Sequence, residues 1–348
     1  MSTFAKSTFN ALVYSASRPT YPTELFEHIF AFHRAGKNAQ WERAADLGCG
    51  TGQATLQLHP FKEVLGVEPS AGMLEKARAY AASKVADPSK FKFVQGSAED
   101  TSKAIAENSA DLIVAAQAAH WFDWSKVWPE TYRALRPGGT VAFWIYAEFR
   151  LPQFPTLGEK ITAYAQGTDP KASVGSHFQR PGRTILERHL VDVPEPSEFG
   201  VKLEPLHRVF FCGDEVPPFV PKESPIHPVL MRTEMRWRDL LAYFRTWSAL
   251  HTYHERYPED LTSPEDTRFL EEDLSSDSED TSKCLVVFVI CMSADSCKGD
   301  VRGGDIAIRF WKDLREGAAK TSPGATVGIN DVVRVEWPVA LIMTRKSC

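Results

Sequence analysis

The sequence predicts an α/β fold in which helices cover both faces of a doubly wound, mostly parallel sheet. Between Arg43 and Ile145, short apolar runs alternate with amphipathic segments, which is the pattern of successive βαβ units. Glycines crowd the turn that follows the first apolar run, where folds of this class bind ligands. We expect a sheet of seven strands with an antiparallel last strand, a helical segment before it and a long insertion within it.

Five strands and two helices are expected between Arg43 and Ile145. One helix should begin after Gly52, and the next should be capped by Ser70. A tight turn at Pro137-Gly138-Gly139 should lead into the fifth strand. The expected strands are Ala44–Leu47, Val64–Val67, Phe91–Gln95, Leu112–Ala115 and Thr140–Ile145.

The two ends of the chain lack the regular alternation of strands and helices expected in this region. Residues 1–40 are expected to be helical, with a break at Pro19 and Pro22 and an apolar face in residues 23–34. Prolines become frequent after residue 151 and the periodicity weakens. The elements expected there are a strand at Val209–Cys212, helices at Trp237–Arg256 and Ile306–Gly317, and Val332–Trp337 with Val339–Thr344 as a strand pair or one long bent strand.

Residues 271–303 have an unusual composition. The stretch 271–283 is acidic and rich in serine, so we expect a solvated loop. The apolar run Cys284–Met292 follows at once. Two interpretations stay open for this run: a buried strand, or an inserted segment outside the core that is prone to aggregate.

Charge and composition exclude several classes of protein. The 348 residues carry 40 Lys and Arg against 45 Asp and Glu, so the bulk basic surface of a nucleic-acid-binding protein is missing. No apolar run reaches the roughly 18–20 residues that span a bilayer. The amino end lacks a secretory signal, and the six cysteines show no zinc-site spacing. We therefore expect a cytosolic protein with reduced thiols and no metal.

The stretch Asp46-Leu-Gly48-Cys49-Gly50-Thr-Gly52 is the most informative motif. It follows a strand and precedes a helix, and its glycines allow a sharp turn and a close approach to a ligand. The spacing differs from the G-x-G-x-x-G of dinucleotide sites. It suits a ligand with an amino-acid tail in place of a pyrophosphate, and Asp46 is placed to accept a hydrogen bond from its ammonium group.

A second acidic residue stands at the end of the second strand. Glu68 lies 22 positions after Asp46, and an acid at that place can accept hydrogen bonds from both hydroxyls of a ribose. The glycine loop and Glu68 together predict a nucleoside ligand with an amino-acid tail.

These residues resemble the motifs of class I S-adenosylmethionine-dependent methyltransferases over residues 40–150. The resemblance implies that Ser97, Ala98 and Glu99, after the third strand, contact adenine. It also places Ala115–Asp123 where the methyl donor faces its acceptor, with Gln117 either lining the cofactor site or capping the strand. The cofactor residues expected are Tyr14, Arg18, Asp46, Gly48, Cys49, Gly50, Gly52, Glu68, Ser97, Ala98, Glu99 and Gln117.

A narrower resemblance is to the fungal trans-aconitate methyltransferase group. It rests on Tyr14 to Pro22, Gln117 to Trp124, Gln179 to Arg183, and Tyr243 to Ala249. It implies a helical lid over residues 1–40, with Tyr14 and Arg18 over the cofactor, and a cofactor-binding core at 41–150. An acceptor-site insertion is expected at 151–330 and a final strand within 331–348.

The residues expected around the methyl acceptor are His120, Trp121, Tyr146, Arg183 and Arg245. Arginine suits a carboxylate because its planar fork donates two parallel hydrogen bonds. Other roles stay open: His120 and Tyr146 as packed core residues, Arg183 as a solvated side chain, and Arg245 as part of a structural ion pair.

The expected reaction is methylation of a small organic acid to give a methyl ester. One alternative is methylation of a hydroxyl or amine with His120 as the base. Another is binding of S-adenosylmethionine without catalysis. We expect a small-molecule partner, no nucleic acid or membrane, and a monomer or a weak homodimer.

Overall fold

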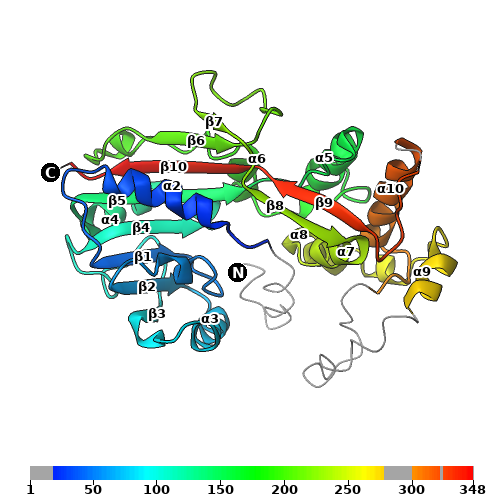
Figure 1. The fold of residues 1–348 in the computed structure, drawn as a ribbon, viewed down its shortest axis with the longest axis horizontal. Helices are drawn as coiled ribbons and strands as arrows, with labels where there is room; N and C mark the ends of the chain where they lie inside the picture. The colour runs from blue at the N-terminus through cyan, green and yellow to red at the C-terminus, as the bar shows by residue number, and fades with distance from the viewer. Residues whose placement is uncertain (1–18, 278–299, 322–323, 348) are drawn as a thin grey trace. The chain divides into compact units, whose positions relative to one another are not determined.

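The computed structural model describes residues 19–277, 300–321 and 324–347 (Figure 1). Tyr14, Arg18 and the run Cys284–Met292 lie outside these residues. The described chain forms two compact units. We call them the sheet unit, made of Pro19–Ala147, Arg180–Met231 and the stretch from Trp337, and the helical unit, made of Glu148–Gln179 and Arg232–Glu336.

The sheet unit is built on eight strands in the order β3-β2-β1-β4-β5-β10-β6-β7. The first five in chain order pair in parallel, while β10 runs antiparallel to both β5 and β6. The mostly parallel sheet and its antiparallel last strand are confirmed. The strands are β1 Arg43–Leu47, β2 Glu63–Glu68, β3 Phe91–Gln95, β4 Ala110–Ala116, β5 Leu135–Tyr146, β6 His207–Phe211, β7 Ile226–His227 and β10 Val339–Arg345.

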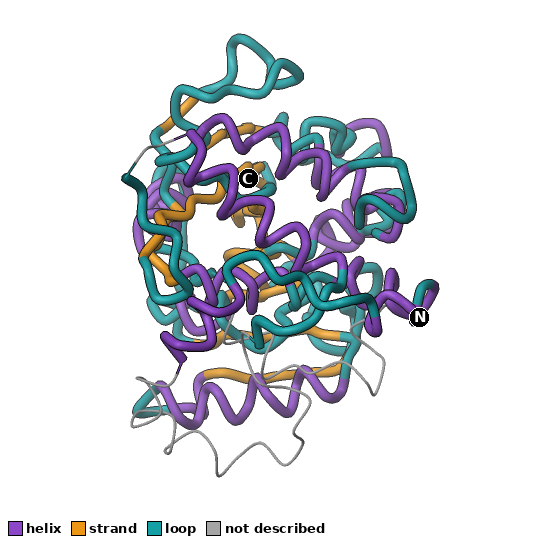
Figure 2. Tube along the Cα trace, turned by 90° about the vertical axis from the view of Figure 1, so that its right-hand side faces the viewer, coloured by secondary structure: helices purple, strands orange, loops and turns teal. Residues whose placement is uncertain are grey.

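The expected number of seven strands was wrong by one. The eighth strand, β7, has two residues and pairs with the edge of β6. A segment this short carries no alternating pattern, so the sequence gives no signal for it. The loop that joins β6 to β7 projects from this edge of the sheet in both views (Figures 1 and 2).

The helices of the sheet unit follow the expected apolar faces. Helix α2 (Thr23–Arg34) buries Leu25, Phe26 and Ile29. Helix α3 (Ala71–Lys84) is capped by Ser70, whose hydroxyl accepts a hydrogen bond from the Met73 amide at 3.4 Å. The others are α4 Trp124–Ala134, α6 Gly182–Glu187, and the 3-10 turns η2 Thr55–Leu58, η3 Pro88–Lys90, η4 Ala119–Trp121 and η7 Pro196–Phe199.

Two turns of the sheet unit differ from the sequence prediction. The helix expected after Gly52 is only η2, a single 3-10 turn. The turn at Pro137-Gly138-Gly139 forms a bulge inside β5, because Leu135 pairs with Ala110 while Thr140 pairs with Leu112. Gly138 has a φ of +80° there, a conformation that favours glycine.

The helical unit packs around aromatic side chains. The rings of Tyr164 and Phe310 stack with centroids 3.8 Å apart, and Phe244 and Trp247 adjoin them. Its elements are α5 Gly158–Gln166, α7 Trp237–Phe244, α8 Ser248–Arg256, α9 Leu270–Asp277, α10 Ile306–Thr321, and the 3-10 turns η5 Pro155–Leu157, η6 Gly175–His177 and η8 Pro258–Thr262. Strands β8 Met231–Arg236 and β9 Val332–Trp337 form a separate two-stranded sheet.

Several predictions for this region were wrong. The single helix expected at Trp237–Arg256 is broken after Phe244, and α8 begins at Ser248. The stretches Val332–Trp337 and Val339–Thr344 neither pair with each other nor form one strand. Pro338 separates β9 from β10, and the two strands belong to different sheets.

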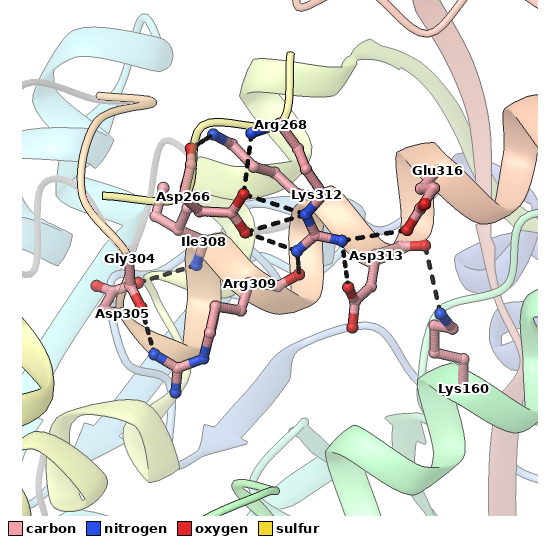
Figure 3. A network of polar contacts seen from close by, with 10 residues as sticks. All are labelled: Lys160, Asp266, Arg268, Gly304, Asp305, Ile308, Arg309, Lys312, Asp313 and Glu316. Atoms are coloured by element: carbon pink, nitrogen blue, oxygen red, sulfur yellow. Dashed lines mark hydrogen bonds and ion pairs between the residues drawn. The ribbon is translucent and has the colours of Figure 1, made fainter. Parts of the chain in front are cut away.

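The acidic stretch after residue 270 begins as helix α9, where a loop was expected. Asp273 in that helix is fully buried and accepts two hydrogen bonds of 2.7 Å from Arg315 of α10. Nearby, Arg268 joins Asp266 to Asp313 and Glu316 of α10, and Lys312 donates to the Asp266 carbonyl (Figure 3). These ion pairs hold the acidic stretch against α10. Composition alone does not predict them, because the partners are far apart in the sequence.

No helix among the described residues is long and apolar enough to cross a lipid bilayer.

Candidate functional site

The predicted cofactor residues that the structure describes gather where the strand order of the sheet reverses. The order β3-β2-β1 turns to β4-β5 at the pair β1 and β4, and open parallel sheets bind their ligands outside the carboxyl ends of strands at such a point. The glycine loop follows β1, Glu68 ends β2, Gln117 follows β4 and Tyr146 ends β5.

The glycine loop adopts a backbone that other residues rarely reach. Gly48, Gly50 and Gly52 have φ angles of +71°, +54° and +84°. A side chain at Gly48 would place its Cβ 2.6 Å from the methyl carbon of Ala118, whereas a Cβ at Gly50 would meet nothing within 4 Å. Gly48 is therefore required by packing, and Gly50 faces space that a ligand can use.

Asp46 is a fully buried acid at the end of β1. Its Oδ2 accepts a hydrogen bond of 2.7 Å from the Thr55 hydroxyl of η2. Its Oδ1 is buried and has no hydrogen-bond partner among the residues described. Burial raises the pKa of Asp46 to about 7, with a smaller contribution from the charge of Glu68. An unmatched buried acceptor is costly, so it suits a donor brought by a ligand.

Glu68 is held at the end of β2 by two backbone amides. Its Oε2 accepts from Gly50 N at 3.1 Å and its Oε1 from Ser70 N at 3.0 Å. Burial raises the pKa of Glu68, and these two bonds oppose that shift. Each oxygen keeps a further lone pair, so the carboxylate is oriented while it stays able to accept from two hydroxyls.

The three residues predicted to contact adenine lie just after β3. Ser97 forms an isolated antiparallel bridge with Asp100, and the Ala98 side chain is buried. The Glu99 carboxylate accepts a hydrogen bond of 3.2 Å from the Asp123 amide, at the N-terminus of α4.

Gln117 and Tyr146 meet between the ends of β4 and β5. The Gln117 side-chain oxygen accepts from Tyr146 N at 2.7 Å, and its nitrogen donates to Tyr146 O at 3.2 Å. Gln117 has a φ of +54°, which is uncommon for a residue with a side chain. The Tyr146 side chain is buried.

The segment that carries His120 and Trp121 packs against the start of α6. The two rings lie 4.8 Å apart, with His120 buried and Trp121 39% exposed. A Cβ at Gly182 would lie 2.7 Å from the His120 carbonyl oxygen. The neighbouring Arg183 is part of α6, with its side chain largely buried, and its Nε donates to Glu187 at 3.0 Å.

Arg183 and Arg245 belong to different units of the chain. Arg245 follows α7 in the helical unit, where Nη1 lies 3.9 Å from Asp305 Oδ2 and Nη2 donates to the Asp300 carbonyl at 3.4 Å. Both contacts are long, so they hold the guanidinium loosely.

Three features of the site escaped sequence reasoning. Thr55 is the partner of Asp46, Glu187 holds Arg183, and Gly182 allows α6 to approach His120. None of the three has a local sequence signal, because each contact joins residues that only the fold brings together.

Two further observations concern metals and thiols. Among the described residues, no cluster of three or more His, Cys, Asp or Glu side chains could hold a metal ion. The thiol of Cys49 is buried in the glycine loop, and burial raises its pKa well above the ordinary value. A thiol in this state is a poor nucleophile.

Comparison with known proteins points to one family. Residues 45–143 match the family model described as "Methyltransferase domain". The Saccharomyces cerevisiae protein named "Probable S-adenosylmethionine-dependent methyltransferase" is 32% identical over 184 residues, which cover 53% of this chain and 60% of that protein. Trans-aconitate 2-methyltransferase of Deinococcus radiodurans is 35% identical over 106 residues, covering 29% of this chain and 37% of that protein.

A solved structure from Anaeromyxobacter dehalogenans, provisionally assigned as a type II methyltransferase, shares the fold. It covers 95% of this chain and 98% of its own, with a TM-score of 0.55 and 20% sequence identity. The chain spans about three fifths of the length of the first two curated relatives it matches, the second being a Dictyostelium discoideum protein.

Proposed function

Residues 45–143 belong to the class I S-adenosylmethionine-dependent methyltransferases, and from this premise we propose that the whole chain methylates a small molecule. The acceptor is the carboxylate of a small organic acid, and the product is its methyl ester. The trans-aconitate methyltransferase among the relatives supports this acceptor class.

The arrangement of Asp46, Gly50 and Glu68 carries the proposal. Glu68 accepts hydrogen bonds from the ribose hydroxyls while the Gly50 and Ser70 amides hold it in place. The unmatched Oδ1 of Asp46 accepts from the ammonium of the amino-acid tail. Ser97 and the Ala98 backbone lie on the adenine side. These residues fit S-adenosylmethionine, which supplies a sulfonium-activated methyl group.

The transfer itself needs positioning more than acid–base chemistry. A carboxylate oxygen forms the new bond to the methyl carbon as the carbon–sulfur bond breaks, and the sulfur leaves as a neutral thioether. The carboxylate is ionised at neutral pH, so no proton has to be removed, and alignment supplies most of the rate. His120 and Arg183 orient the acid, and Trp121 and Tyr146 line the space that it occupies.

One observation favours a second acceptor class. The Nε of Arg183 is already committed to Glu187, whereas His120 follows the strand that ends beside the glycine loop. With a hydroxyl or amine acceptor, His120 takes up the proton. That reaction slows at a pH below the pKa of the base, whereas carboxylate methylation stays flat through neutral pH.

The first test is calorimetric titration with S-adenosylmethionine and, separately, with NAD. We expect micromolar binding of S-adenosylmethionine and none of NAD. Glu68→Ala should weaken binding by roughly 10- to 100-fold, because a hydrogen bond to a charged group contributes about 1.5–3 kcal/mol. Glu63→Ala, at the other end of β2, is the matched control and should bind normally.

An acceptor screen led by tricarboxylic acids follows, with S-adenosylhomocysteine formation as the readout. Turnover of trans-aconitate that falls at least tenfold in Arg183→Met supports the carboxylate proposal. Absent binding of S-adenosylmethionine, or equal binding by the Glu68 variant, overturns the cofactor assignment. If the enzyme turns over only alcohols or amines, and His120→Ala abolishes that turnover, the acceptor is a hydroxyl or amine and the carboxylate proposal is wrong.

A further inference from the structure

We propose that Gln117 is a positioning residue whose side chain replaces one step of the β4–β5 ladder and thereby fixes the loop Ala118–Trp121. The proposal rests on the methyltransferase function and adds a specific device to it. The loop contains His120 and Trp121, the residues that we place beside the acceptor.

The backbone of β4 leaves the sheet at Gln117. Ala116 is still in register with Trp144, and the Gln117 amide donates to the Trp144 carbonyl at 2.9 Å. The φ of +54° at Gln117 then turns the chain away. The peptide of Tyr146 in β5 lies beyond Ala116 and Trp144, the last register pair of the two strands.

The Gln117 side chain fills this position. A carboxamide has the same donor and acceptor as a peptide group, and here its oxygen accepts from Tyr146 N while its nitrogen donates to Tyr146 O. The pairing copies the two hydrogen bonds that a continuing strand would make. The backbone of residues 118–121 is therefore released from the sheet, while Gln117, directly before it, stays fixed to β5.

Two glycines leave space for the released loop to pack closely. The Ala118 methyl occupies the space that a side chain at Gly48 would need, so the loop touches the cofactor-binding turn. Gly182 of α6 lies against the His120 carbonyl and the Trp121 ring. Because these contacts are so close, a small shift of the loop changes them. Loss of the hydrogen bonds at Gln117 therefore displaces His120 relative to the glycine loop.

This arrangement separates positioning from direct cofactor contact. Both polar atoms of the amide are engaged by Tyr146, and strain of the kind seen at Gln117 persists where the surrounding structure fixes it. We therefore expect changes at Gln117 to alter turnover much more than affinity for S-adenosylmethionine.

Two variants test the proposal. Gln117→Met keeps the volume and removes both hydrogen bonds. Gln117→Glu mimics glutamine only when protonated, because the acid then donates to Tyr146 O and accepts from Tyr146 N. When ionised, the carboxylate faces the Tyr146 carbonyl and loses one bond. We expect the turnover of Gln117→Glu relative to wild type to fall at least tenfold from pH 5.5 to pH 8.5.

Wild type is measured at each pH because Asp46 and Glu68 also titrate. Trans-aconitate is the probe acceptor. Gln117→Met should lower kcat at least tenfold at every pH, with the Kd for S-adenosylmethionine within twofold of wild type. Gln57→Met, a half-buried glutamine in η2, is the matched control and should leave both unchanged. A parallel pH profile for Gln117→Glu and wild type overturns the proposal.

Hydrogen exchange of residues 118–122 needs no acceptor. We expect Gln117→Met to exchange these amides at least tenfold faster than wild type, and unchanged exchange overturns the proposal. If wild type fails to bind S-adenosylmethionine, the proposed function fails, while the exchange result still decides the positioning role. If it binds S-adenosylmethionine but leaves trans-aconitate unchanged, only the acceptor class is wrong.

Discussion

At the scale of single residues, Asp46 shows how a binding site costs stability. Its carboxyl is buried with one oxygen unmatched, and burial raises its pKa to about 7. In the unfolded chain an aspartate has its ordinary pKa near 4. The folded state therefore binds the proton more tightly. Its contribution to stability is present below pH 4 and is lost as the pH rises through 7.

We predict that Asp46→Asn makes the ligand-free protein more stable at pH 8. A difference of about three pKa units corresponds to about 4 kcal/mol as an upper limit. Asparagine still accepts from the Thr55 hydroxyl but carries no charge. Urea unfolding at pH 5 and pH 8 should show a smaller pH dependence than wild type. Asp214→Asn, at an exposed position, should leave that dependence unchanged.

The prediction of the ligand rested on residues that are local to one motif and the acid that follows it. The glycine spacing and Glu68 indicated a nucleoside with an amino-acid tail, and the family assignment of residues 45–143 agrees. The roles of single residues remain predictions. The contacts of Thr55 and Glu187 were not predicted, because a threonine in a turn or a glutamate on a helix has no signature until the fold brings its partner near.

At the scale of elements, periodicity predicted the parallel strands well. It failed where long-range contacts decide the structure. The helix over Trp237–Arg256 keeps its apolar face across the break, since Phe244 and Trp247 both pack against Phe149. The acidic stretch at α9 is helical because Arg315 neutralises the buried Asp273. Neither contact is visible in a local window of sequence.

Helix α6 offers an element-scale prediction. Gly182→Ala should destabilise the protein by about 1–3 kcal/mol, because the new methyl group would collide with the His120 carbonyl oxygen at 2.7 Å. Gly158→Ala in α5 meets nothing within 4 Å and should be neutral or stabilising, since alanine favours helix. Urea unfolding measures both. If the two variants are equally stable, α6 accommodates the added methyl group by shifting, with no loss of unfolding free energy.

At the scale of the whole molecule, each of the two units contains apolar packing of its own. The apolar cluster around Phe143, Trp128 and Ile342 draws all of its members from the sheet unit. The stacked rings of Tyr164 and Phe310 belong to the helical unit. The predicted cofactor residues that the structure describes all lie in the sheet unit, whereas the buried pair of Asp273 and Arg315 lies in the helical unit.

This division predicts two separable thermal transitions. Ligand that binds only the folded state stabilises by about 2.7 kcal/mol at 100 times its Kd, so S-adenosylmethionine should raise the transition of the sheet unit. Asp273→Ala leaves Arg315 as an uncompensated buried charge, which costs about 3–5 kcal/mol, and should lower only the transition of the helical unit. Glu271→Ala, exposed on the same helix, is the control. Scanning calorimetry distinguishes the outcomes, and a single transition that responds to both changes would mean that the units unfold together.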